Sequence, residues 1–183
     1  MSDWSGVSTV SGSEHVKWGF FLGDAPVGGT RSHTHMATFV SGDRITSGMY
    51  DTAGKLRLGG TAEYNGHAIG TVVDAGGSRL AAGTYRDTFN FDTRTGTFEL
   101  GFDGRDYSGP STGDFREGVG ALYSGSTEAP AGSAPSDFAA TVAGEFVHNG
   151  GSVASVTQPS GLIGSFDIGG PSYSATGTFG AVR

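Results

Sequence analysis

The stretch NFDTRTGTFELGFDGRDYSG, residues 90–109, decides the fold class. Apolar side chains take every second position on either side of the segment DTRTG, and they are Phe89, Phe91, Phe98, Leu100 and Phe102. Successive side chains of a strand point to opposite faces, so each arm has one apolar face. DTRTG has the composition of a chain reversal. The stretch is therefore predicted to be a β-hairpin with strands over 79–91 and 96–107.

The acidic residues of this hairpin pose the question of a metal or acid–base site; they are Asp92, Glu99, Asp103 and Asp106. The alternation places them on the polar face or in the turns. A calcium loop needs oxygen ligands at alternate positions and a final bidentate carboxylate, and DGRDYSG lacks that pattern. A water-facing hairpin is the favoured interpretation, and a cation site is the alternative. We predict no bound metal.

The same alternation recurs through the rest of the chain. Strands are predicted over 61–73, 79–91, 96–107, 118–124, 138–148, 151–157, 162–168 and 173–182, and turn-forming segments separate them. The 34 glycines and the many Thr, Val and Phe residues agree with short strands and tight turns. Eight consecutive strands predict an all-β fold, an antiparallel up-and-down β-barrel, whose closure leaves no exposed edge.

The N-terminal part is predicted to add one or two strands to this barrel. Residues 1–14 are polar and rich in Ser and Gly, which indicates a flexible segment. HVKWGFF (15–21) and HMATFVSG (35–42) alternate like strands, with a loop over 22–34 between them. These two strands pack against the barrel or complete it. Residues 15–183 then form a single β-barrel domain, and 124–137 form an exposed loop of that barrel.

Charge and composition exclude several classes of function. The net charge is −7 and the basic residues are scattered, so a nucleic-acid partner is not expected. The chain has no cysteine, which excludes disulfides and thiolate metal sites. No apolar run reaches the roughly 20 residues of a spanning helix, so no transmembrane segment is predicted. The N-terminus lacks a signal peptide, which fits either a cytoplasmic protein or a domain of a larger exported one.

Histidines are the candidate ligand-binding residues. His33 and His35, in SHTHM, are two positions apart on an extended segment and point to the same side, an arrangement that can ligate a transition metal or a haem iron. The alternative is a strand start that faces solvent. His67 alternates in phase with Asn65 and Ile69, which can place it in the barrel interior as a ligand or as a hydrogen-bonded core histidine. We expect no cofactor, and haem is the candidate if these histidines act.

A catalytic site is not expected. GPSTG (109–113) matches the hydrolase pattern G-x-S-x-G, but that serine works on a turn between a strand and a helix, and no helix is predicted here. No base or phosphate-binding loop accompanies it. The chain is therefore predicted not to be an enzyme. The inward-facing residues decide whether the barrel interior is filled or hollow. Aromatic rings that face inward fill it, whereas small inward residues leave a ligand cavity.

Several motifs together resemble a known family. GTAEYNGHAIGTVVDAG, YRDTFNFDTRTGTFELGFDGRDYSG, VAGEFVHNGGSVASV and SATGTFGAVR look like the C-terminal barrel of transferrin-binding-protein-like surface proteins. HVKWGFF and HMATFVSG resemble in particular the barrels at the C-termini of FecR-domain-containing proteins of Gram-negative bacteria. The resemblance covers most of 15–183. It implies a surface-exposed or secreted module, and it assigns no catalytic residue.

The expected function is a non-enzymatic binding or interaction module, extracellular or on the cell surface, within a larger exported protein. Its partner is a protein or a small ligand, and the oligomeric state stays open. One alternative is a small-ligand or haem carrier that uses His33, His35 or His67. The other is a structural subunit of a surface layer or filament.

Overall fold

A computed structural model describes residues 7–9, 16–27, 30–43, 45, 58–116, 120–127, 137–148 and 158–183. Within these ranges the chain forms strands and no helix. The strands are β1 (Val7–Thr9), β2 (Val16–Val27), β3 (Thr30–Gly42), β4 (Thr61–Asp74), β5 (Gly77–Asn90), β6 (Thr95–Phe102), β7 (Arg105–Arg116), β8 (Gly120–Thr127), β9 (Ala139–Val147), β10 (Gly161–Gly170) and β11 (Tyr173–Val182).

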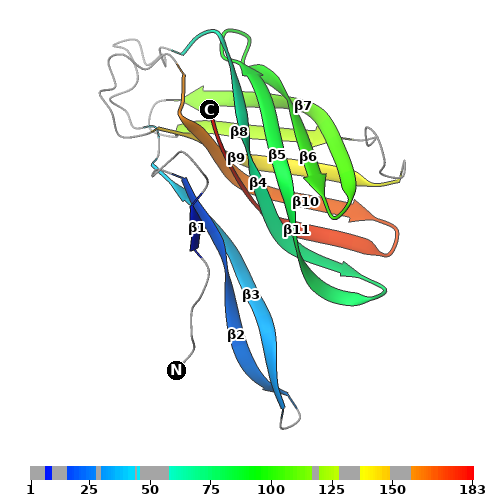
Figure 1. Cartoon of the computed structure of the whole chain (residues 1–183). Helices are drawn as coiled ribbons and strands as arrows, with labels where there is room; N and C mark the ends of the chain where they lie inside the picture. Colours follow the sequence, from blue (N-terminus) through cyan, green and yellow to red (C-terminus); the bar gives the residue numbers. More distant parts are fainter. Residues whose placement is uncertain are drawn as a thin grey trace.

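Strands β4 to β11 close into an eight-stranded antiparallel barrel (Figure 1). Each strand pairs with its neighbour in the chain, and β11 pairs with β4 to complete the circle, from Tyr173 opposite Asp74 to Val182 opposite Asn65. The predicted all-β, up-and-down barrel is confirmed. Every barrel strand has a neighbour on both sides, which removes the exposed edge that an open sheet would have.

The predicted strand over 96–107 is wrong, because the chain reverses inside it. Asp103 and Gly104 have φ angles of 53° and 74°, and Phe102 pairs with Arg105. Two successive positive φ angles are those of a tight hairpin turn that suits the twist of the flanking strands. The turn-forming segment expected between the predicted strands 96–107 and 118–124 consequently lies within β7 as far as Arg116. The predicted strand over 151–157 lies outside the described residues, as do 128–136 of the predicted long loop.

The N-terminal strands form a separate three-stranded sheet in the order β1-β2-β3. The predicted loop over 22–34 is wrong, since the β2–β3 ladder continues to Val27 opposite Thr30, with one irregularity after Phe21. Backbone pairing, and not apolar alternation, extends this hairpin. β1 lies within the segment predicted to be flexible and pairs with β2. In Figure 1 the β2–β3 hairpin extends well beyond the barrel.

The base of the hairpin packs against the outer wall of the barrel and does not complete it. Val16 is buried, and a Cβ placed on Gly42 would lie 2.9 Å from the Val147 side chain. The backbone amide of His148 donates to the carbonyl of Asp43 at 2.9 Å. These contacts fix the hairpin to the barrel at the end of β9.

Aromatic rings fill the barrel interior. The largest fully buried side chains are Tyr64, Tyr85, Tyr107, Phe89, Phe98, Phe102, Phe146, Phe166, Phe179, Leu100, Leu162 and Val16, all but the last of which belong to the core cluster. Glycines stand opposite the rings: a Cβ on Gly164 would lie 2.6 Å from Phe179, and one on Gly70 would lie 2.8 Å from Phe166. The strand glycines therefore make room for aromatic rings. Because the rings occupy that space, the structure disfavours a ligand cavity inside the barrel.

Candidate functional site

A groove of about 910 Å³ crosses the outer wall of the barrel over β4, β5, β6 and β7. Its lining comprises Asn65, Gly66, His67, Thr84, Tyr85, Arg86, Glu99, Leu100, Gly101, Asp106, Tyr107, Ser108, Val182 and Arg183. The outward side chains among them are mostly polar and exposed. The groove is the candidate binding site.

The strand register explains why these residues meet. One row of cross-strand neighbours runs from His67 to Thr84, Gly101 and Asp106. Gly101 contributes no side chain to this row, and a Cβ there would lie 2.8 Å from the Thr84 hydroxyl. The outer surface is therefore lower at Gly101 than at its neighbours, and the groove opens there.

A second row borders the first and carries the charges. It consists of Asn65, Arg86, Glu99 and Ser108, which are neighbours on four successive strands. The Arg86 guanidinium contacts Glu63 at 3.0 Å and Glu99 at 3.6 Å. The hydrogen bond from Arg86 lowers the pKa of Glu63, and the Asn65 amide adds to this effect at 2.9 Å. The border thus presents hydrogen-bonding groups of both charges to a ligand.

The three candidate histidines fall in two different places. His67 is exposed on β4 and lines the groove, so the expectation that it lies in the barrel interior is wrong. His67 does share a face with Asn65, but the inward face of β4 is the opposite one, with Tyr64 and Ala68. His33 and His35 lie on β3, opposite Asp24 and Leu22 of β2. Ligand binding and haem ligation by these residues stay predictions.

Three of the four acidic residues of 90–109 are exposed, as the hairpin interpretation expects. Asp92 accepts a hydrogen bond from the backbone amide of Gly60 at 3.0 Å, and Glu99 and Asp106 border the groove. Asp103 is half-buried in the turn between β6 and β7. Among the described residues, no three histidine or carboxylate groups are placed to hold a metal ion.

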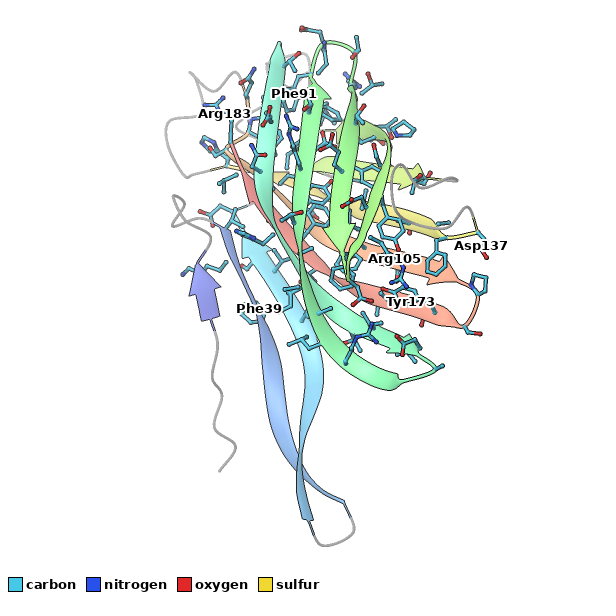
Figure 2. The ribbon with its side chains drawn as sticks, turned by 45° about the vertical axis from the view of Figure 1, so that its right-hand side comes forward. Phe39, Phe91, Arg105, Asp137, Tyr173 and Arg183 are labelled. Atoms are coloured by element: carbon cyan, nitrogen blue, oxygen red, sulfur yellow. The ribbon has the colours of Figure 1, made fainter. Side chains whose placement is uncertain are left out.

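Asp103 organises a charged cluster at one end of the barrel. Its Oδ2 accepts hydrogen bonds from Arg79 at 2.7 Å, from Arg105 at 3.2 Å and from the Tyr173 hydroxyl at 3.2 Å. The Arg105 guanidinium lies 4.4 Å from the Tyr173 ring centre and 5.0 Å from that of Phe138. Figure 2 shows Arg105 and Tyr173 together, at the end away from Phe91. This cluster ties three turns together and is structural.

A buried polar group inside the barrel was not predicted. The Asp87 side chain is fully buried, and its Oδ2 accepts hydrogen bonds from Tyr123 at 2.5 Å and from Ser111 at 2.8 Å. The hydroxyls of Tyr85 and Tyr123 are 2.6 Å apart. The signal was present in the sequence, because Asp87 occupies an inward position between Tyr85 and Phe89.

Ser111, the serine of the GPSTG match, lies in the interior of a strand. It is 1% exposed, and its hydroxyl donates a hydrogen bond to the Asp87 carboxylate. A serine nucleophile needs an adjacent base and access to its substrate. The hydrolase interpretation has no support in this geometry.

Comparison with solved structures agrees with this architecture. The chain is similar to the crystal structure of a mutant of the vaccine antigen Transferrin Binding Protein B (TbpB) from Haemophilus parasuis Hp5, with a TM-score of 0.61 and 16% sequence identity. The match covers 100% of this chain and 38% of that one, so the chain spans well under half of its neighbour. At this identity the likeness shows a shared fold: the barrel is TbpB-like.

No protein-family model and no curated protein matches the chain. The part of the chain that the structure describes contains no helix of the length and apolar character needed to cross a membrane.

Proposed function

We propose that the chain is a non-enzymatic binding module that contacts its partner through the groove on the outer wall of β4–β7. One observation carries the proposal: the barrel interior is filled by aromatic rings, whereas the outer wall is hollowed into a groove of about 910 Å³ with exposed polar groups. A filled barrel has no room for a ligand inside. Its contacts must then be made from outside.

The proposed place of action is a bacterial surface, within a larger exported protein. The TbpB-like fold supports this, since that structural neighbour is named for binding a protein, and the present chain spans only 38% of it. The resemblance of HVKWGFF (15–21) and HMATFVSG (35–42) to the barrels of FecR-domain-containing proteins is the second support for this part of the proposal. A protein partner is favoured over a small ligand, because the groove is open along several strands and its border carries both charges.

Site-directed photo-crosslinking tests the proposal. A benzoylphenylalanine at Thr84 places the probe in the groove, and the same residue at Thr141, exposed on β9 across the barrel, is the matched control. Purified transferrin and a surface extract of the source cells are the two samples. We expect a crosslinked partner with the probe at Thr84 and none with the probe at Thr141. Excess wild-type protein without the probe should compete for the partner and reduce crosslinking, whereas the Thr84→Trp variant should not. Equal crosslinking at both positions, or none at either, would contradict a groove contact.

An activity measurement tests the non-enzymatic part. We expect no hydrolytic or redox turnover from the purified chain. Turnover that a single substitution at Ser111 or Asp87 abolishes, while the barrel stays folded, would overturn this part of the proposal.

A further inference from the structure

Among the residues that the structure describes, no cation pairs with the Asp87 carboxyl group inside the barrel. Its side chain is 0% exposed on the inward face of β5. Two neutral hydroxyls, those of Tyr123 and Ser111, donate to Oδ2, while Oδ1 is buried without a hydrogen-bond partner. A buried carboxylate is normally paired with a cation or fully hydrogen-bonded. Asp87 meets neither condition.

Among the described residues, the side chains that face Asp87 carry neutral hydroxyl groups. The titratable ones that face it are Tyr85 on its own strand, Tyr123 on β8 and Tyr64 on β4, and β7 contributes Ser111. Burial raises the pKa of Asp87 to about 6, although the hydroxyls of Tyr123 and Ser111 act in the opposite direction. Ionised Asp87 would also raise the pKa of all three tyrosines, so none of them supplies a compensating charge.

The hydroxyl chain serves both protonation states of Asp87. If the carboxyl is neutral with its proton on Oδ2, the hydrogen bond described above reverses: Oδ2 then donates to the Tyr123 hydroxyl, which donates to Tyr85 across 2.6 Å. When it is ionised, Tyr85 donates to Tyr123, and Tyr123 donates to Asp87. The bonds persist and only their direction reverses. What changes is the buried charge, which the aromatic interior disfavours.

We propose that Asp87 is a pH-dependent lock of the barrel: the folded state holds it as a neutral acid in mildly acidic surroundings, and its ionisation at higher pH loosens the wall of β5, β7 and β8. The direction follows from proton linkage. Above the usual pKa of an aspartate, about 4, the unfolded chain has released this proton while the folded barrel still binds it. Stability therefore falls as pH rises from about 4 to about 6, and it stays lower above that.

Thermal unfolding across pH tests the lock. Between about pH 4.5 and pH 8, we expect the Tm of the wild-type chain to fall by about 5–10 °C through this group. Asp87→Asn accepts the same two hydrogen bonds but cannot ionise, so the difference between its Tm and that of the wild type should grow with pH. Asp106→Asn, exposed on β7, is the control and should follow the wild-type profile. Parallel profiles for wild type and Asp87→Asn would overturn the proposal.

A second measurement does not depend on the variant folding. The carboxyl carbon of Asp87 in the wild-type protein, followed by ¹³C NMR, should titrate with a midpoint near 6. A midpoint at the ordinary value for aspartate, about 4, would exclude the lock. Either result leaves the binding proposal standing, because Asp87 is not part of the groove.

Discussion

The two faces of strand β5 differ completely over five residues. Tyr85, Asp87 and Phe89 point into the barrel and are at most 1% exposed, while Arg86 and Thr88, between them, are exposed. Inside, Tyr85 stacks on Phe179 with ring centres 3.9 Å apart. Outside, Arg86 is 47% exposed and makes ion pairs with side chains that are as exposed as itself. This strand thus has one face packed in the barrel interior and one face exposed to solvent.

This contrast separates the residues that hold the barrel together from those that are free to serve binding. Changes to packed rings should cost several kcal/mol because a cavity remains where the ring was. Changes to exposed charges should cost almost nothing, since water replaces the partner. The outer wall can therefore vary in chemistry while the barrel stays folded, which suits a binding surface.

Phe146→Ala should have the largest effect. Phe146 is fully buried, with ring centres 4.9 Å from Phe89 and 5.7 Å from Tyr64. We expect a loss of about 3–5 kcal/mol in the free energy of unfolding, measured by urea denaturation. Thr141→Ala, outward on the same strand, is the control and should leave the unfolding curve unchanged. A loss below about 1 kcal/mol at Phe146 would show that the interior is not packed this way.

Gly164→Ala should come next, because it tests the close approach of backbone and ring. A methyl group there would clash with the carbonyl of Ala143 and lie 2.6 Å from the Phe179 ring. The expected loss in unfolding free energy is roughly 1–3 kcal/mol. Gly169→Ala is a control on the same strand, since a Cβ there meets nothing within 4 Å. If both variants unfold at the same urea concentration, the glycine does not make room for the ring.

Asp103→Asn tests the charged cluster at the end of the barrel, where the side chains are neither fully packed nor fully exposed. The substitution keeps a residue that tolerates the positive φ of 53°, but removes the charge that Arg79 and Arg105 contact. We expect a loss of roughly 1–2 kcal/mol in unfolding free energy, reduced by added salt. Asp106→Asn should produce less change. Equal effects of the two would show that the cluster around Asp103 contributes no more than an exposed charge.

Arg86→Gln should have the smallest effect. The pKa of Glu63 is lowered by Arg86, so their pairing favours the fold above the usual pKa of a glutamate and is lost on acidification. Both side chains are nearly half exposed, and solvent screens the pair. We expect the Tm of this variant to fall by no more than about 2 °C at neutral pH and to equal that of the wild type at high salt. A clear drop would mean that the outer wall is as constrained as the interior.

The turn between β6 and β7 has a local signal in the sequence. Phe98, Leu100 and Phe102 alternate in phase, but Gly104 and Asp106 take the next positions of that face and Tyr107 is out of phase, so the alternation breaks after Phe102. The dipeptide Asp103–Gly104 is the better indicator, because its two positive φ angles suit a two-residue hairpin turn. The same shift explains why GPSTG, rich in turn residues, lies in a strand: Gly109 and Gly113 are small where the chain passes the rings of Phe98 and Phe89.

The groove could be anticipated only in part. Its residues alternate with the core residues of their strands, so their outward direction is readable from the sequence. Their meeting is not readable, because it depends on the register that places His67 beside Thr84 and Thr84 beside Gly101. A shift of one residue would exchange the two faces of a strand.

The sequence by itself determined the all-β class, the up-and-down barrel and the inward direction of the phenylalanines. These follow from alternation and turn composition, which are local properties of the chain. Tertiary structure alone decided that rings and glycines fill the interior, that four strands bring the groove residues together, and that Asp87 is enclosed without a counter-charge among the described residues. Each of these depends on contacts between strands far apart in the chain, whose register and closure no local pattern specifies.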